Sequence, residues 1–167
     1  AVKVHLGSGK YPQSAAAGGS ITVGGVSGAN RRAAQTALWQ VFERLEETER
    51  KVPGNEVAKA FEAFLGEHGE ALRLFAVHQV LEETLGRSPS HAWEPYAETA
   101  SPAALVFAKE HAQRIRFHCW LQFEADRQLA RAADQGLKLG LYGDLAVGID
   151  PHGADVWSEP DAFVRGA

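Results

Sequence analysis

The chain has 167 residues, of which 45% are hydrophobic and 23% are charged, a composition typical of an ordinary globular domain. Its net charge of −4 argues against a nucleic-acid-binding protein, because such proteins concentrate positive charge on one face. No apolar run approaches the roughly 18 residues that a membrane-spanning helix needs, and no secretory signal pattern opens the chain, so we expect a soluble cytoplasmic protein with neither nucleic acid nor membrane as a partner.

The first 30 residues differ from the rest because they are rich in glycine, alanine and serine. Two short alternating pieces, at residues 2–6 and 20–23, are compatible with edge strands. A flexible or vector-derived leader is equally compatible with this composition. We therefore divide the chain into a leader, residues 1–30, and a helical domain, residues 31–167, that ends in a strand and a loop.

Helical periodicity begins at Arg31 and predicts a first helix that ends at the Val52-Pro53-Gly54 turn. Asn55 is a suitable cap for a second helix, which Gly66 and Gly69 interrupt. A third helix follows over residues 72–85, and Gly86 ends it. Apolar residues of this third helix occupy a wide arc, which predicts burial on more than one side. The charge run that includes Glu46, Glu47 and Glu49 is interpreted as a solvated helix face.

Residues 87–100 are predicted to form a loop, and Ser101-Pro102 then supplies a capping hydroxyl followed by proline at the first helical position. The helix that starts there extends to about Gln135, with a break near His111. Within it, the single cysteine, Cys119, is interpreted as a buried small hydrophobe. His118 is interpreted as a core histidine with a hydrogen-bond partner.

The last part of the chain changes character. Residues 137–142 read as a buried strand, with Gly143-Asp144 at its end, and residues 150–153 read as a turn. Residues 158–161 are compatible with the start of a short helix. Helix, glycine and strand in succession form one step of an α/β unit. The predicted fold is mainly α with a small β component, in which a helical subdomain precedes one β/α step.

Two stretches resemble the bacterial 4-alpha-glucanotransferases known as amylomaltases. Residues 117–129, FHCWLQFEADRQL, are similar to that family's long helix with spaced aromatic and glutamine residues. Residues 140–157, GLYGDLAVGIDPHGADVW, are similar to its strand and following loop. Ala146 and Gly153 differ from the proline and serine that many members have. The likeness covers roughly residues 55–163 by pattern.

This resemblance implies a (β/α)8 barrel with helical insertions, and the chain would hold one β/α step of an incomplete (β/α)8 barrel. It also implies an enzyme that transfers α-1,4-glucan segments with retention of configuration. Retention needs two carboxyl groups about 5–5.5 Å apart, one of them a nucleophile. In the family the nucleophile lies in a later Arg-x-Asp-His motif, which occurs nowhere in these 167 residues, and the acid/base glutamate lies later still. We therefore expect a truncated enzyme that is inactive alone and has no catalytic residue of its own.

The resemblance assigns substrate contacts to Asp144, Asp155 and Trp157, with a maltooligosaccharide as the partner. Asp144 follows the predicted strand, at the end where barrel active sites are built. Its alternative role is to cap a strand-to-loop turn, which is favoured in the isolated chain because the opposite wall of the pocket is missing. For Trp157, packing on a sugar ring and covering the core edge are equally favoured.

No cofactor and no metal ion are expected. Asp144, Asp150 and Asp155 do not have the alternating spacing of a calcium loop, and the histidines lack the HExxH context of a zinc site. Two further functions remain open. One is a helical interaction module that self-associates into a homo-oligomer through exposed apolar helix faces. The other is a residual sugar-binding module.

Overall fold

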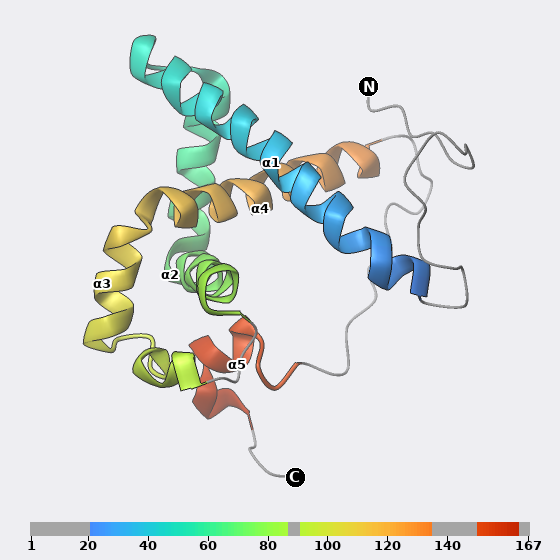
Figure 1. Ribbon diagram of the computed structural model, residues 1–167. Coiled ribbons are helices and arrows are strands. Elements are labelled where there is room, and N and C mark those ends of the chain that lie inside the picture. Colours follow the sequence, from blue (N-terminus) through green and yellow to red (C-terminus); the bar gives the residue numbers. More distant parts are fainter. Residues whose placement is uncertain (1–20, 87–90, 135–149, 164–167) are drawn as a thin grey trace. The chain divides into compact units, whose positions relative to one another are not determined.

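The structure, a computed structural model, describes residues 21–86, 91–134 and 150–163 (Figure 1). Every regular element within these ranges is a helix, so the predicted mainly helical character is confirmed. The strand predicted at residues 137–142 lies outside the described residues, and with it the β/α step of the predicted fold. The described residues form two units that divide between Glu47 and Thr48.

Helix α1, Ile21–Lys51, begins ten residues before the point at which the helical period becomes clear in the sequence. Residues 21–23, for which an edge strand was considered, are helical, so that interpretation is wrong. Four alternating residues are a weak strand signal when no partner strand lies nearby. The division of the chain at residue 30 stays a prediction.

The turn between α1 and α2 is capped from both sides. Backbone N–H groups of Gly54 and Asn55 donate to the Glu49 carboxylate at 2.8 and 3.0 Å. The Asn55 side chain accepts from the N–H of Val57 at 2.8 Å, which confirms its predicted capping role. Glu49 therefore stabilises the turn, a role that its interpretation as part of a solvated helix face did not include.

Helix α2, Glu56–Leu85, joins the second and third predicted helices into one element with a kink at Gly69. Gly69 has φ 50° and ψ −131°, a conformation that residues with a Cβ atom rarely adopt. Gly86, with φ 81°, ends the helix as predicted. The segment after the kink is buried over a wide arc, which confirms the prediction from its pattern, and its most buried residues are Ala76, Val77, His78, Val80 and Leu81.

Three helices follow. The 3-10 helix η1, His91–Tyr96, occupies part of the predicted loop. Helix α3, Pro102–Glu110, starts at the predicted cap, where Ser101 Oγ accepts from the N–H of Ala104 at 3.2 Å. The predicted break falls at His111, which has φ −104° and ψ 18°, and helix α4, Ala112–Ala133, continues beyond it.

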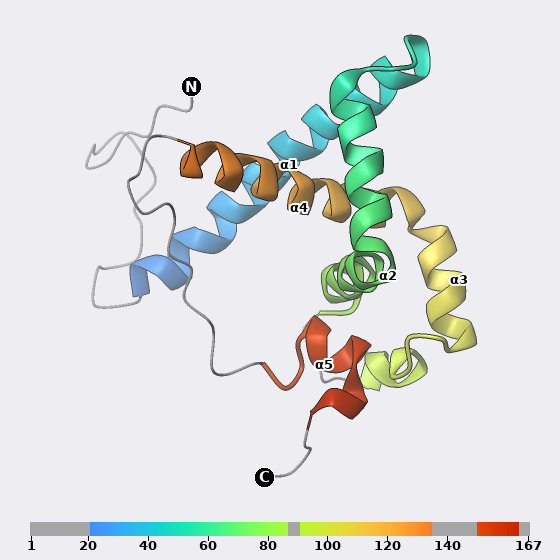
Figure 2. The ribbon, with the colours of Figure 1, turned by 180° about the vertical axis from the view of Figure 1, so that it is seen from behind.

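The core of the second unit lies between α2 and α4, which pack against each other along both segments of α2 (Figure 2). The Phe123 ring of α4 contacts Phe61 and Phe64 of α2, at centroid distances of 5.5 and 5.6 Å. Ile115, Phe117, Cys119 and Trp120 of α4 are also buried. Cys119 is 4% exposed, which confirms its interpretation as a buried small hydrophobe, and burial raises the pKa of its thiol to about 11.

Candidate functional site

The segment that carries Asp155 and Trp157 begins with a hydrogen-bonded turn. Asp150 accepts twice, from the backbone N–H of His152 through its side chain at 3.0 Å and from that of Gly153 through its carbonyl at 2.9 Å. This confirms the predicted turn at residues 150–153. Helix α5, Ala154–Ser158, follows directly, and the 3-10 helix η2, Pro160–Ala162, confirms the short helix predicted after it.

Helix α5 lies beside the C-terminal end of α2 and next to η1 (Figure 1). Trp157 holds it there, because its indole N–H donates to the carbonyl of Tyr96 at 2.7 Å. The Trp157 ring also contacts the His78 imidazole of α2, at a centroid distance of 5.7 Å. Trp157 is half-buried, so part of the ring serves as an anchor and part faces solvent.

Asp155 is exposed on α5. Residues two positions apart on a helix leave it in different directions, so the carboxylate of Asp155 and the ring of Trp157 do not share one face. The structure therefore brings these two predicted site residues onto one short helix, with one exposed and the other partly packed. Asp144 lies outside the described residues, and its role as a substrate contact stays a prediction.

His78 is the residue at this junction that the sequence did not single out. It is 2% exposed, its Nε2 lies 3.2 Å from the His152 carbonyl, and its ring contacts Trp93 of η1 at 5.1 Å. Burial lowers the pKa of His78 below its ordinary value. Glu82, the His152 carbonyl, Asp150 and Asp155 act in the opposite direction but do not outweigh the burial. A lone histidine within an apolar helical run is the only signal that marks it in the sequence.

A second polar centre joins α2 to α4. Arg114 donates to both carboxylate oxygens of Glu83, at 2.7 and 2.9 Å, and His118 Nε2 lies 3.1 Å from Glu83 Oε1. Burial acts to raise the pKa of Glu83, but hydrogen bonds from His118 and Arg114 outweigh it and lower the pKa to about 2. His118 is 5% exposed in its residue surface and has a partner, as predicted.

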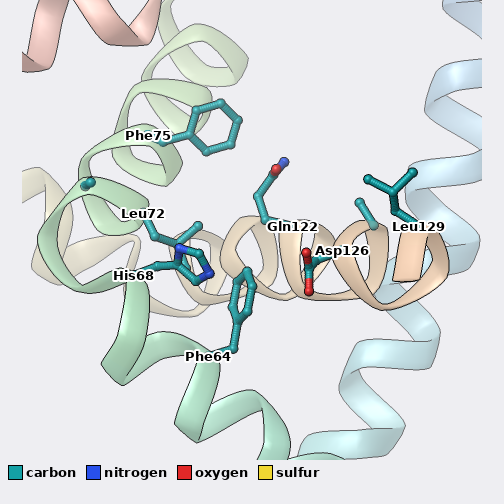
Figure 3. Close-up of a pocket in the computed structure, with 9 residues that line it drawn as sticks. Phe64, His68, Leu72, Phe75, Gln122, Asp126 and Leu129 are labelled. Carbon is teal, nitrogen blue, oxygen red and sulfur yellow. The ribbon is translucent and has the colours of Figure 1, made fainter. Parts of the chain in front are cut away.

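An open cavity of about 570 Å³ lies between α2 and α4 (Figure 3). Phe64, His68, Leu72 and Phe75 line it from α2, whereas Gln122, Asp126 and Leu129 line it from α4. Neither Asp155 nor Trp157 lines this cavity. Its polar groups come from two helices and do not converge with Asp155, so it forms a surface separate from α5.

Among residues 21–86, 91–134 and 150–163, no three histidine, cysteine or acidic side chains gather as they would around a metal ion. Within the same ranges, no helix has the length and apolar character needed to cross a bilayer.

Comparison with known protein families matches residues 24–167 to the family model described as 4-alpha-glucanotransferase. The chain is similar to the 4-alpha-glucanotransferase of Mycobacterium tuberculosis, with 38% identity over 112 residues, which are 64% of this chain and 15% of that protein. It is similar to that of Haemophilus influenzae, with 35% identity over 120 residues, which are 63% of this chain and 17% of that protein. A 4-alpha-glucanotransferase of Oryza sativa subsp. japonica has 28% identity over 111 residues, 64% of this chain and 12% of the relative. The chain therefore spans less than a fifth of the length of these relatives.

Proposed function

The chain belongs to the 4-alpha-glucanotransferase family, and from this premise we propose that it carries part of a maltooligosaccharide-binding surface without the groups that perform glycosyl transfer. The contacts with sugar are Asp144, Asp155 and Trp157. The observation that supports the proposal is the α5 segment, where Asp155 is exposed and the partly exposed indole of Trp157 is hydrogen-bonded to Tyr96. The two side chains leave the helix in different directions, so they would contact different parts of a glucan that passes over α5.

The chemistry of these groups suits a glucan. A carboxylate accepts hydrogen bonds from two sugar hydroxyl groups, and hydrogen bonds to charged groups are the stronger kind. The apolar face of a pyranose ring packs on an indole, and the hydrogen bond from Trp157 to Tyr96 fixes the orientation of that indole before any ligand arrives. Asp144, which precedes the 150–153 turn in the sequence, is the third proposed contact.

A binding experiment tests this surface. Maltoheptaose is titrated into the chain while tryptophan fluorescence and heat are recorded. Asp155→Asn is expected to weaken binding about tenfold, because a charge-assisted hydrogen bond contributes about 1.5–3 kcal/mol. Asp161→Asn is the matched control, since Asp161 is also exposed and lies in the adjacent η2. No heat and no change in emission for the unchanged chain would contradict the proposal.

A separate assay tests the absence of transfer activity. The sequence contains no Arg-x-Asp-His motif, and retaining transfer needs a nucleophile and an acid/base carboxyl. The purified chain is expected to leave maltotriose unchanged. Formation of glucose and longer maltooligosaccharides, abolished by Asp144→Asn, would show that these residues supply the chemistry after all.

Exposed apolar side chains favour a second candidate, a self-associating helical module. Leu105 and Val106 of α3 are 47% and 54% exposed, and Leu129 of α4 is 60% exposed. Such residues promote association when they form a contiguous patch. Sedimentation velocity over a range of concentrations distinguishes the two candidates, because a concentration-dependent dimer that Val106→Asp abolishes supports association. A monomer at every concentration would contradict it.

A further inference from the structure

The His78 imidazole connects three elements that are far apart in the sequence. It belongs to α2, its Nε2 faces the carbonyl of His152 just before α5, and its ring contacts the indoles of Trp93 and Trp157. Each indole is itself fixed by a backbone acceptor, since Trp93 donates to Gly86 at 3.0 Å and Trp157 to Tyr96 at 2.7 Å. The imidazole therefore lies among groups that have little freedom to move aside.

The hydrogen bond at Nε2 fixes the position of one proton on this ring. A carbonyl only accepts, so Nε2 carries a proton and donates it to His152. Nδ1 is buried and has no hydrogen-bond partner among the described residues. The neutral ring with a bare Nδ1 is thus compatible with the site, because an unprotonated nitrogen in apolar surroundings costs less than a buried N–H or a charge.

Protonation would change this balance. It would place a second N–H at Nδ1 and a positive charge on a ring that is 2% exposed. Four acidic or carbonyl groups act in favour of the charge, from α2, the 150–153 turn and α5, namely Glu82, Asp150, Asp155 and the carbonyl of His152. On η1 the titratable groups, His91 and Glu94, are exposed, and His91 Nδ1 lies 2.8 Å from a carboxylate oxygen of Glu94. Burial outweighs the favourable groups, so protons bind more readily when the ring is released.

We propose that His78 is a positioning residue that docks α5, and with it Asp155 and Trp157, onto α2 only while its imidazole is neutral. Acid then releases α5 from α2, whereas the α2–α4 core stays folded. The release concerns the docking of a helix and is independent of whether the chain binds a glucan. The docking of α5, which carries Asp155 and Trp157, would therefore depend on pH.

The test follows the indole N–H of Trp157 by NMR in the full chain, without any sugar. Its protection against hydrogen exchange, corrected for the intrinsic rate, is expected to fall at least about tenfold between pH 7.5 and pH 5, equivalent to about 1.4 kcal/mol. The indole N–H of Trp120, which is buried on α4, is the internal reference and is expected to keep its protection. No protection of Trp157 at pH 7.5, or equal losses at both indoles, would overturn the proposal.

His78→Gln separates titration from simple packing. The glutamine amide retains a donor for the His152 carbonyl but cannot be protonated in this range. The variant is expected to hold Trp157 with no pH dependence, whereas His68→Gln, at an exposed position on the same helix, is expected to leave the pH dependence unchanged. If His78→Gln does not fold, the titration of the His78 ring in the unchanged chain replaces it. A ring midpoint that differs from the midpoint of Trp157 release contradicts the proposal.

Discussion

Helix α2 takes part in two interfaces, one with a charged carboxylate that is paired and one with a buried histidine that is neutral. Against α4 it presents Glu83, whose charge is matched by Arg114 and by a hydrogen bond with His118. Against α5 it presents His78, a group that is titratable but uncharged where it lies, with one nitrogen hydrogen-bonded and the other without a partner in the described structure. A paired charge resists acid until the carboxylate is protonated, whereas a neutral buried histidine is sensitive at a much higher pH.

The shifted pKa values of His78 and Glu83 make the two interfaces sensitive to pH in different ranges. The folded pKa of His78 lies below its ordinary 6.5, so its contribution to stability is complete above that pH and declines as the pH falls below it. The folded pKa of Glu83 is about 2, against an ordinary 4.5, so its contribution is complete above 4.5 and declines between 4.5 and about 2. Mild acid therefore acts on the α5 junction first.

The largest expected effect comes from a substitution at a fully buried position of α2. Leu81 is fully buried on α2, so Leu81→Ala is expected to lower the free energy of unfolding by about 2–5 kcal/mol through lost burial and a residual cavity. Leu105→Ala, at a side chain that is 47% exposed, is the control and is expected to cost less than about 0.5 kcal/mol. Urea unfolding measures both. A similar loss of unfolding free energy in the two variants would show that the burial of Leu81 does not stabilise the fold.

A smaller effect is expected from Glu83→Gln, which affects only the α2–α4 interface. The lost pairing with Arg114 and His118 is expected to cost about 1–2 kcal/mol, because partial exposure screens the charges. The variant should also lose the decline in stability that the unchanged chain shows between pH 4.5 and 2. Glu70→Gln removes the exposed pairing with Arg73 and is the control. Equal urea midpoints for the two variants across pH 3–7 would refute the assignment.

Trp157→Phe should have the smallest global effect, because it affects only the α5 junction. The variant loses the donor to Tyr96 but keeps an aromatic ring against His78, at a cost of about 1 kcal/mol. This loss is expected in local opening of α5 rather than in global unfolding. Limited proteolysis within residues 150–163 measures it, with Leu129→Ala as a control at an exposed site. Unchanged cleavage would show that Tyr96 does not hold Trp157.

The features of the fold that the sequence predicted are those encoded by neighbouring residues. Asn55 and Ser101 begin helices and Gly86 ends one because each acts on backbone groups a few residues away. The break at His111 and the burial of His118 were likewise readable from pattern. The capping role of Glu49 was missed, because a carboxylate within a run of charges carries no mark that distinguishes a cap from a solvated side chain.

The candidate site was less predictable, because its contacts join distant parts of the chain. The acceptor for His78 lies 74 residues away and the acceptor for Trp157 lies 61 residues away, and no local pattern encodes either pairing. The family resemblance identified Asp155 and Trp157 as substrate contacts, but it gave no reason to select His78. The role of Asp144 remains a prediction.

The central claim is that α5 leaves α2 in mild acid while α4 stays in place. Backbone hydrogen exchange, measured by mass spectrometry at several pH values and corrected for the intrinsic rate, compares peptides from residues 150–163 with peptides from residues 112–126. The account predicts that protection in residues 150–163 declines below about pH 6.5, whereas protection in residues 112–126 persists to about pH 4.5. Loss of protection in both segments at one common pH would contradict it.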